Sequence, residues 1–155
     1  MTFASPEITL PDEAATDSLA IRIAALLRPG DVILLHGPIG SGKSHFARAL
    51  IRARLGNPDE EVPSPTFTIV QTYPDHAGDI WHCDLYRLGH SDEIVELGLD
   101  EAFTGAICLI EWPDRLGDAR PESALDLQLR ASPGGHRAIL SGPDEWRDRL
   151  KDVLD

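Results

Sequence analysis

The segment Gly37-Pro38-Ile39-Gly40-Ser41-Gly42-Lys43-Ser44 matches the pattern GxxxxGK, followed by Ser or Thr, at every constrained position. Glycines allow the tight turn in which successive backbone N–H groups point inward at phosphate oxygens. A helix that starts at such a loop directs its partial positive charge at the same anion. The segment therefore predicts a phosphate-binding loop in which Lys43 reaches the β- and γ-phosphates and Ser44 ligates Mg²⁺.

The residues on either side supply the context that this motif requires. Residues 32–35 form a continuous apolar run, typical of a strand covered on both faces. Residues 43–55 place apolar side chains on one helical face, and Gly56, Asn57 and Pro58 then end the helix. Strand, loop and helix in this order favour a phosphate-binding loop over a glycine-rich turn with an exposed lysine.

Elsewhere, β-rich runs alternate with helical patterns, which predicts an α/β fold. The chain is long enough for one self-supporting core, so we expect a single P-loop ATPase domain over residues 1–155. Its expected architecture is a P-loop NTPase-like layered fold with a mostly parallel central sheet flanked by helices. The further expected strands are residues 3–10, 66–73, 79–85, 106–110, 124–130 and 137–140, with a hairpin loop at 74–78; the further helices are 12–27 and 143–154, with helical turns at 91–97.

Composition narrows the class of partner. The chain has 14 basic and 26 acidic residues, a formal net charge of −12, which makes direct, high-affinity nucleic-acid binding a poor hypothesis. Cys83 and Cys108 have neither CxxC nor framework spacing, so we expect reduced, buried thiols. We see no secretory signal and no apolar run near the ~18 residues of a membrane span, so a cytoplasmic protein is expected.

A phosphate-binding loop also needs a carboxylate that holds Mg²⁺ or its waters at the tip of a neighbouring strand. Two acids qualify: Glu111 follows the run 106–110, and Asp84 lies near the end of the run 79–85. Sequence alone leaves both open. His82, Cys83 and Asp84 do not form a metal site, because successive strand side chains point to opposite faces.

Three further observations concern the nucleotide and its surroundings. The NKxD motif, with which GTP-binding proteins recognise guanine, is absent from the sequence. Residues 75–78 match their DxxG motif but fall in a predicted turn, so ATP is favoured over GTP. Trp112 follows Glu111 and is the one tryptophan that we expect to contact the nucleotide site. Arg87 either senses the γ-phosphate or forms a surface salt bridge, and the sequence does not rank these two.

Five segments occur in the order in which a known family has them: residues 10–16, the phosphate-binding loop, 64–68 (SPTFT), 82–87 (HCDLYR) and 110–113 (IEWP). The chain resembles the TsaE family, small bacterial ATPases required for threonylcarbamoyladenosine modification of tRNA. The resemblance spans residues 8–140. It implies an ATPase that acts on a TsaB–TsaD complex, which transfers threonylcarbamoyl to adenosine 37 of tRNA. The protein would contact tRNA only indirectly and would not contact a membrane.

The resemblance also implies roles for individual residues. Ser44 and Glu111 would hold Mg²⁺, and residues 40–45, including His45, would wrap the phosphates. Residues 64–67 would form a switch loop with Thr66 near the γ-phosphate. Asp84, Tyr86 and Arg87 would line the active site or the partner surface, and Glu13 and His136 would lie near the adenosine. Pro38 stands where the family loop usually has Asp.

Three functions remain distinguishable. The first is a partner-dependent ATPase with slow intrinsic hydrolysis, since no evident base lies beside the loop. The second is a small-molecule P-loop kinase, which needs an arginine-bearing lid; the segment after Glu111 offers only Arg115 and Arg120. The third is a nucleotide-gated binding module whose hydrolysis is incidental.

Overall fold

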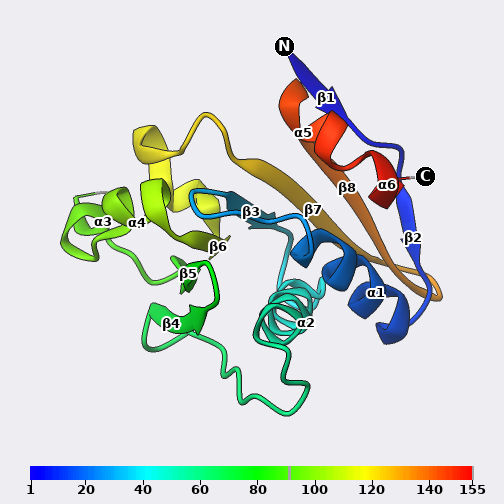
Figure 1. The fold of residues 1–155 in the computed structure, drawn as a ribbon, viewed down its shortest axis with the longest axis horizontal. Helices are drawn as coiled ribbons and strands as arrows, with labels where there is room; N and C mark the ends of the chain where they lie inside the picture. The colour runs from blue at the N-terminus through cyan, green and yellow to red at the C-terminus, as the bar shows by residue number, and fades with distance from the viewer. Residues whose placement is uncertain (91, 155) are drawn as a thin grey trace.

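The computed structural model describes residues 1–90 and 92–154. Within this part of the chain, eight strands form one sheet in the order β1-β8-β7-β3-β6-β5-β4, with β2 also paired to β8 (Figure 1). The strands are β1 (Thr2–Ala4), β2 (Ile8–Leu10), β3 (Val32–His36), β4 (Val70–Asp75), β5 (Gly78–Asp84), β6 (Ile107–Glu111), β7 (Leu125–Ser132) and β8 (Gly135–Pro143).

The centre of the sheet is parallel and its edges are antiparallel. Strands β7, β3, β6 and β5 are neighbours that run in one direction. Strands β4 and β8 run the opposite way, beside β5 and β7. Because β1 and β2 are antiparallel to β8, they share the direction of the central strands. The fold is therefore a mixed α/β layered fold, as predicted, and the antiparallel strands lie outside its parallel core.

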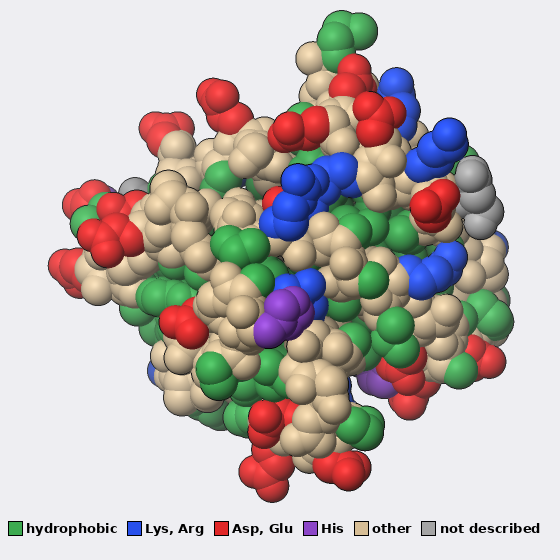
Figure 2. Space-filling model, viewed as in Figure 1, with side chains coloured by type: hydrophobic (Ala, Val, Ile, Leu, Met, Phe, Trp, Pro, Cys, Tyr) green, Lys and Arg blue, Asp and Glu red, His purple; other side chains and the backbone are tan. Residues whose placement is uncertain are grey.

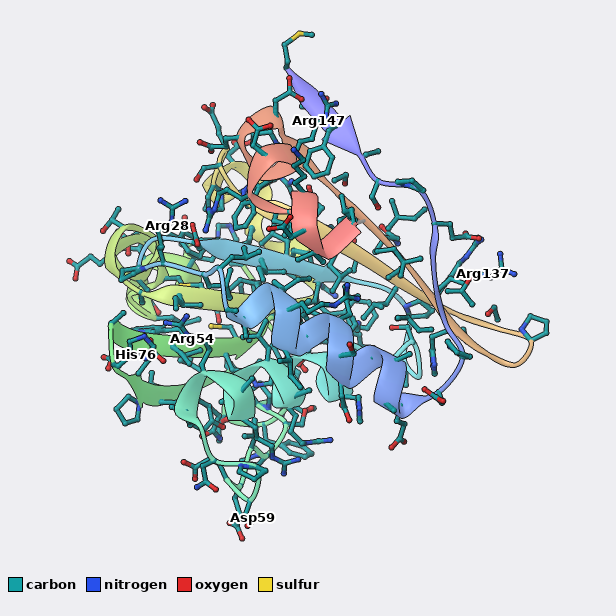
Figure 3. All side chains as sticks on the ribbon, turned by 45° about the vertical axis from the view of Figure 1, so that its right-hand side comes forward. Arg28, Arg54, Asp59, His76, Arg137 and Arg147 are labelled. Carbon is teal, nitrogen blue, oxygen red and sulfur yellow. The ribbon has the colours of Figure 1, made fainter. Side chains whose placement is uncertain are left out.

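Helices cover both faces of the sheet. On one face, α1 and α2 lie side by side (Figure 3) and pack with the inward side chains Ile33 and Leu35 of β3. On the other face, α3, α4 and the 3₁₀ segment η1 pack with Val32 and Leu34. Alternate β3 residues thus enter two separate cores, which explains why residues 32–35 are all apolar. The helices are α1 (Glu13–Ala24), α2 (Lys43–Leu55), α3 (Glu93–Glu96), α4 (Leu99–Gly105), η1 (Pro113–Ala119), α5 (Asp144–Arg149) and α6 (Lys151–Leu154).

Several predicted elements differ from those observed. The expected strand 3–10 is two strands, β1 and β2, separated by residues 5–7, where Pro6 interrupts the extended run. The expected strand 66–73 begins only at Val70, because residues 65–68 form turns and Ile69 has φ 68°. The final helix is divided at Leu150. Helix α4 and η1 were not predicted, and residue 91 of the expected turns 91–97 lies outside the described residues.

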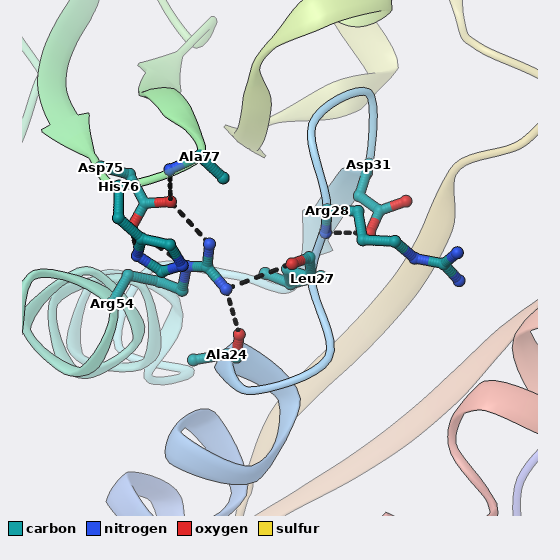
Figure 4. A network of polar contacts seen from close by, with 8 residues as sticks. All are labelled: Ala24, Leu27, Arg28, Asp31, Arg54, Asp75, His76 and Ala77. Carbon is teal, nitrogen blue, oxygen red and sulfur yellow. Dashed lines mark hydrogen bonds and ion pairs between the residues drawn. The ribbon is translucent and has the colours of Figure 1, made fainter.

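One side chain joins three elements far from the phosphate-binding loop. Arg54 of α2 donates both to Asp75, at the end of β4, and to the carbonyls of Ala24, the last residue of α1, and Leu27 (Figure 4). Its Nη2 lies 2.6 Å from Asp75 Oδ2, and the Asp75 side chain is fully buried. Burial raises the pKa of Asp75, but the hydrogen bonds from Arg54 and the Ala77 amide outweigh it and hold that pKa below its ordinary value.

The acidic surface is unevenly distributed. In Figure 2, acidic side chains gather at the left edge over α3 and α4, and at the lower edge over the loop that follows α2. The acidic residues over α3 and α4 are Asp92, Glu93, Glu96, Asp100 and Glu101, and those of the loop after α2 are Asp59, Glu60 and Glu61.

Among the described residues, no helix is both long enough and apolar enough to cross a membrane.

Candidate functional site

The predicted phosphate-binding loop connects β3 to α2, with the bounds of α2 as expected. Gly42 is the N-terminal cap of α2 and has φ 100°, a conformation that side-chain-bearing residues rarely adopt. A Cβ on Gly37 would lie 2.3 Å from the carbonyl oxygen of Leu129 on β7. Both positions therefore require glycine, one for its backbone conformation and the other for close contact with the neighbouring strand.

The loop opens into a cavity of about 550 Å³ at the carboxyl ends of the parallel strands. Ligands bind at this edge in open α/β sheets, because loops and helix N-termini converge there. The cavity brings together most of the residues predicted for the site. Its lining residues are Glu13, Thr16, Ile39, Gly40, Gly42, Lys43, Ser44, His45, Thr66, Asp84, Tyr86, Glu111, Trp112 and His136.

Lys43 is the buried cation of this cavity, with 6% of its surface exposed. Its Nζ donates to the carbonyl of Gly37 at 2.5 Å and lies 3.8 Å from the centre of the Trp112 ring. Burial lowers the pKa of Lys43, against the opposing effect of the Glu111, Asp84 and Asp114 carboxylates. The loop therefore holds its cation in place at the start of α2.

Asp84 and Glu111 end adjacent parallel strands and are direct partners in the register of β5 with β6. Both are buried, at 5% and 2% exposed. The Ser44 hydroxyl donates to Oε1 of Glu111 at 3.1 Å, while Nε2 of His82 lies 2.7 Å from Oε2. A hydroxyl and a carboxylate from two elements thus meet at one point, and oxygen ligands of this kind suit Mg²⁺.

Asp84 also positions the loop that precedes β4. Its Oδ1 accepts from the Tyr86 amide at 3.0 Å, and its Oδ2 accepts from the Thr66 hydroxyl at 3.5 Å. The Asp84 amide donates to the carbonyl of Ile69, the residue with φ 68°. Thr66 is therefore attached to the cavity by a long hydrogen bond and by a turn with a strained residue.

Trp112 follows Glu111 in a left-handed conformation, with φ 57°, and caps η1. Its ring contacts Lys43 and lies 4.9 Å, centre to centre, from the tilted ring of Tyr86. A positive φ at a bulky residue is a genuine outlier and clusters at functional sites. The backbone turn here directs the Trp112 ring back over the lysine.

Helix α1 and strand β8 form the opposite side of the cavity. Glu13 is the first residue of α1, and His136 lies near the start of β8 with its Nε2 3.2 Å from the Gly40 carbonyl. His45 lines the cavity and pairs with Asp17 of α1 at 2.7 Å. The residues that the resemblance assigns to the adenosine therefore share one side of the cavity with the loop.

Three of the predicted site residues do not line the cavity. Gly37 and Ser41 lie within the loop but behind its inner surface; the Ser41 hydroxyl is buried and, in the described part of the chain, lacks a hydrogen-bond partner. Arg87 lies outside, with its guanidinium 5.4 Å from the centre of the exposed Phe67 ring. Conversely, Thr16 and Ile39 line the cavity but were not predicted, although Thr16 follows Glu13 by one helical turn. His82, which contacts Glu111 from outside the lining, was not predicted as a site residue either.

Comparison with known proteins identifies the family. A family model described as "Threonylcarbamoyl adenosine biosynthesis protein TsaE" matches residues 10–139, most of the chain. The chain belongs to the TsaE family. TsaE proteins act in the biosynthesis of threonylcarbamoyladenosine in tRNA.

Individual TsaE relatives match over similar lengths. A tRNA threonylcarbamoyladenosine biosynthesis protein TsaE from Rickettsia bellii is 38% identical over 130 residues, which cover 84% of this chain and 90% of that protein. TsaE from Bacillus subtilis is 37% identical over 130 residues, covering 83% and 78%. A crystal structure of Bacillus subtilis YdiB superimposes with a TM-score of 0.76 at 26% identity, covering 99% of this chain and 94% of that one.

Proposed function

We propose that this protein binds and hydrolyses ATP with Mg²⁺, and that its hydrolysis acts on a TsaB–TsaD complex in the threonylcarbamoylation of tRNA adenosine 37. One observation carries the proposal: Lys43, Ser44 and Glu111 converge in a single cavity at the N-terminus of α2. A helix N-terminus with inward amides, a buried cation and an oxygen pair has the chemistry that a magnesium triphosphate requires.

Each residue then has a defined task. The loop amides and the Lys43 ammonium bind the phosphates and offset the charge that develops on them during transfer. Ser44 and Glu111 would hold Mg²⁺, which would neutralise part of the charge on the phosphates. Thr66 lies on the switch loop beside Asp84, where it can contact the terminal phosphate. Glu13 and His136 would lie near the adenosine, and His45 would lie with the loop beside the phosphates.

The proposal of partner dependence rests on what lies near the site. Asp84 and Glu111, the carboxylates at the strand ends, are both held by hydrogen bonds, so neither is freely placed to act as a general base. Intrinsic hydrolysis should therefore be slow. A net charge of −12 favours a protein partner over direct tRNA contact. The free, buried thiols of Cys83 and Cys108 agree with a reducing, cytoplasmic location.

The kinase alternative receives less support. A kinase lid needs arginines that are free to close over both substrates. Arg120 instead forms a two-bond ion pair with Asp126, and Arg115 lies 6.0 Å from the centre of the Tyr86 ring. A nucleotide-gated binding module differs from the proposal only in whether hydrolysis is needed, so activity measurements distinguish the two.

Replacing Lys43 with Ala tests the binding site. Loss of one charge-assisted contact costs about 1.5–3 kcal/mol, which predicts a drop of about 10-fold or more in ATP affinity by calorimetry. Lys151→Ala is the matched control, because Lys151 is the other lysine of the chain and is exposed on α6. Equal ATP affinity in the two variants would reject the loop assignment.

The partner is tested by adding purified TsaB–TsaD complex to the wild-type chain with ATP, ADP or no nucleotide. We expect nucleotide-dependent association and a faster release of phosphate than from the chain alone. Rapid turnover by the isolated chain, unchanged by the complex, would contradict partner dependence. A Glu111→Ala chain that lacks hydrolysis but still supports tRNA modification would favour the binding module instead.

A further inference from the structure

His82 lies beneath the cavity rather than in its lining. It occupies β5, two residues before Asp84, and 1% of its surface is exposed. Its Nε2 lies 2.7 Å from Oε2 of Glu111, whose other oxygen accepts from Ser44. We propose that His82 is a positioning residue, which fixes the Glu111 carboxylate so that Oε1 faces Ser44 and the metal. This inference rests on the proposed function, because it assigns Glu111 to Mg²⁺.

The hydrogen bonding of the His82 imidazole indicates that this side chain positions Glu111. A carboxylate only accepts hydrogen bonds, so Nε2 of His82 carries the ring proton and donates a hydrogen bond to Glu111. The other nitrogen, Nδ1, is buried and lacks a hydrogen-bond partner in the described part of the chain. A buried polar atom without a partner costs stability. The ring therefore has a single polar contact, and that contact is with Glu111.

Sheet geometry explains why this contact is available only to residue 82. In the register of β5 with β6, His82 pairs with Leu109 and Asp84 pairs with Glu111. These four side chains share one face, because alternate strand residues point the same way. Cys83 points to the opposite face, into the core formed with Leu34 and Cys108. A side chain from position 82 thus reaches forward along the sheet to the end of β6.

The result is a chain of two hydrogen bonds that crosses three elements: β5, β6 and α2. Hydrogen bonds to both carboxylate oxygens restrict rotation about the last side-chain bond of Glu111. Groups that orient a metal ligand without touching the metal affect metal affinity by about 10–100-fold. Removing the His82 donor should therefore weaken Mg²⁺ binding, while the loop that binds the phosphates is left intact.

Three substitutions of His82 test whether the hydrogen-bond donor to Glu111 is needed and whether it must lie at the place of Nε2. His82→Gln places an amide nitrogen as many bonds from the backbone as Nε2, so it retains the donor to Glu111. His82→Asn places the donor where Nδ1 lies, and His82→Phe removes it. We expect the Asn and Phe variants to need about 10-fold more Mg²⁺ for half-maximal nucleotide binding. The Gln variant should recover most of this loss.

Two readouts do not depend on hydrolysis. Nucleotide binding in EDTA should be the same in wild type and all three variants, because His82 does not line the cavity. In the metal-free protein, ¹⁵N–¹H correlation spectra of the imidazoles should show the His82 proton on Nε2. In hydrolysis assays, the Phe variant should lose kcat at fixed Mg²⁺ and regain it at high Mg²⁺, with KM for ATP nearly unchanged.

Leu109→Ala is the matched control for core damage, because Leu109 is the fully buried partner of His82 on β6. It should lower the melting temperature without changing the Mg²⁺ requirement. If the Gln, Asn and Phe variants respond alike, or if the proton resides on Nδ1 alone, the proposal is overturned. If the wild type binds no nucleotide, the proposed function fails instead, and the two failures are thereby distinguished.

Discussion

Asp84 and Glu111 differ in how fully their oxygens are engaged, although both are buried at the ends of neighbouring strands. Glu111 uses one oxygen for Ser44 and the other for His82. Asp84 accepts a backbone amide at Oδ1, whereas its Oδ2 has only the 3.5 Å contact from Thr66. Glu111 is therefore held in the manner of a metal ligand. Asp84 retains the oxygen that is freer to orient a water molecule.

This difference predicts separate defects. Asp84→Asn keeps the acceptor for the Tyr86 amide but removes the charge, so kcat should fall about 10²-fold with little change in affinity for magnesium ATP. Glu111→Gln should mainly raise the Mg²⁺ concentration needed for half-maximal nucleotide binding. Steady-state hydrolysis and titrations with Mg²⁺ check both. The reverse result, with catalysis lost at saturating Mg²⁺ only in the Glu111 variant, would mean that Glu111 orients the water and Asp84 holds the metal.

At the level of residues, the sequence supplied the chemistry of the site but not its contacts. The motif predicted Lys43 and Ser44 directly, and the ends of two apolar runs predicted Asp84 and Glu111. For His82, the sequence excludes a metal cluster and includes the residue in the family segment 82–87, but it assigns the side chain no role. Its partner is 29 residues away, on a strand whose position beside β5 depends on the order of the sheet. No local pattern contains that order.

Among the elements, α2 could be predicted to its end residues because both boundaries are glycines with positive φ, Gly42 and Gly56. The run at residues 66–69 has the β-branched and aromatic composition of a strand, yet it forms a turn. Its Ile69 amide donates to the Pro65 carbonyl, and its carbonyl accepts from Asp84. Contact with a distant strand overrides local propensity there, at the candidate switch loop.

The Arg54 contacts give a prediction about how these elements are held together. Arg54→Ala removes the arginine partner of the buried Asp75 carboxylate and leaves two carbonyls near the end of α1 without their donor. Breaking a buried pair in this way costs about 3–5 kcal/mol of unfolding free energy, measurable by urea denaturation. Arg147→Ala is the control, because its pair with Asp144 is exposed and should contribute less than about 1 kcal/mol. An equal loss of unfolding free energy in the two variants would contradict the proposal that the Arg54 contacts hold these elements together.

The same pair predicts a dependence on pH. The pKa of Asp75 lies below its ordinary value of 3.8 in the folded chain, so its stabilising effect is present above that value. The effect is lost as the pH falls through the lowered pKa. In Arg54→Ala, burial still raises the pKa of Asp75, and only the Ala77 amide and His76 remain to lower it, so the pKa is higher than in wild type and the carboxyl takes up a proton more readily. The difference in unfolding free energy between wild type and variant should therefore shrink as the pH falls to 3.8 and below.

Across the whole molecule, the sheet order is what sequence patterns could not provide. Strand β7 lies beside β3 although about 90 residues separate their paired positions, such as His36 and Gln128. Apolar runs predict that strands exist and are buried, but each run could pair with several others. The observed order places the ends of β3, β5 and β6 together, and so gathers residues from separate segments around one cavity.

The two cysteines report on the integrity of this central sheet. Cys83 of β5 and Cys108 of β6 are fully buried in one core. Burial raises the pKa of Cys108 to about 12 and that of Cys83 well above its ordinary value, so neither forms a reactive thiolate in the folded chain. Labelling by a thiol reagent at pH 8 should therefore require opening of the sheet.

Bound nucleotide should slow that labelling, because a ligand that binds only the folded state stabilises it by mass action. At 100 times its dissociation constant, magnesium ATP should lower the labelling rate about 100-fold, equivalent to about 2.7 kcal/mol. If its ATP affinity is about 10-fold lower, the Lys43→Ala chain should be protected only about 10-fold at the same ATP concentration, whereas Lys151→Ala should behave as wild type. Rapid labelling of either thiol in a chain that remains folded would show that β5 and β6 open locally, independently of the nucleotide site.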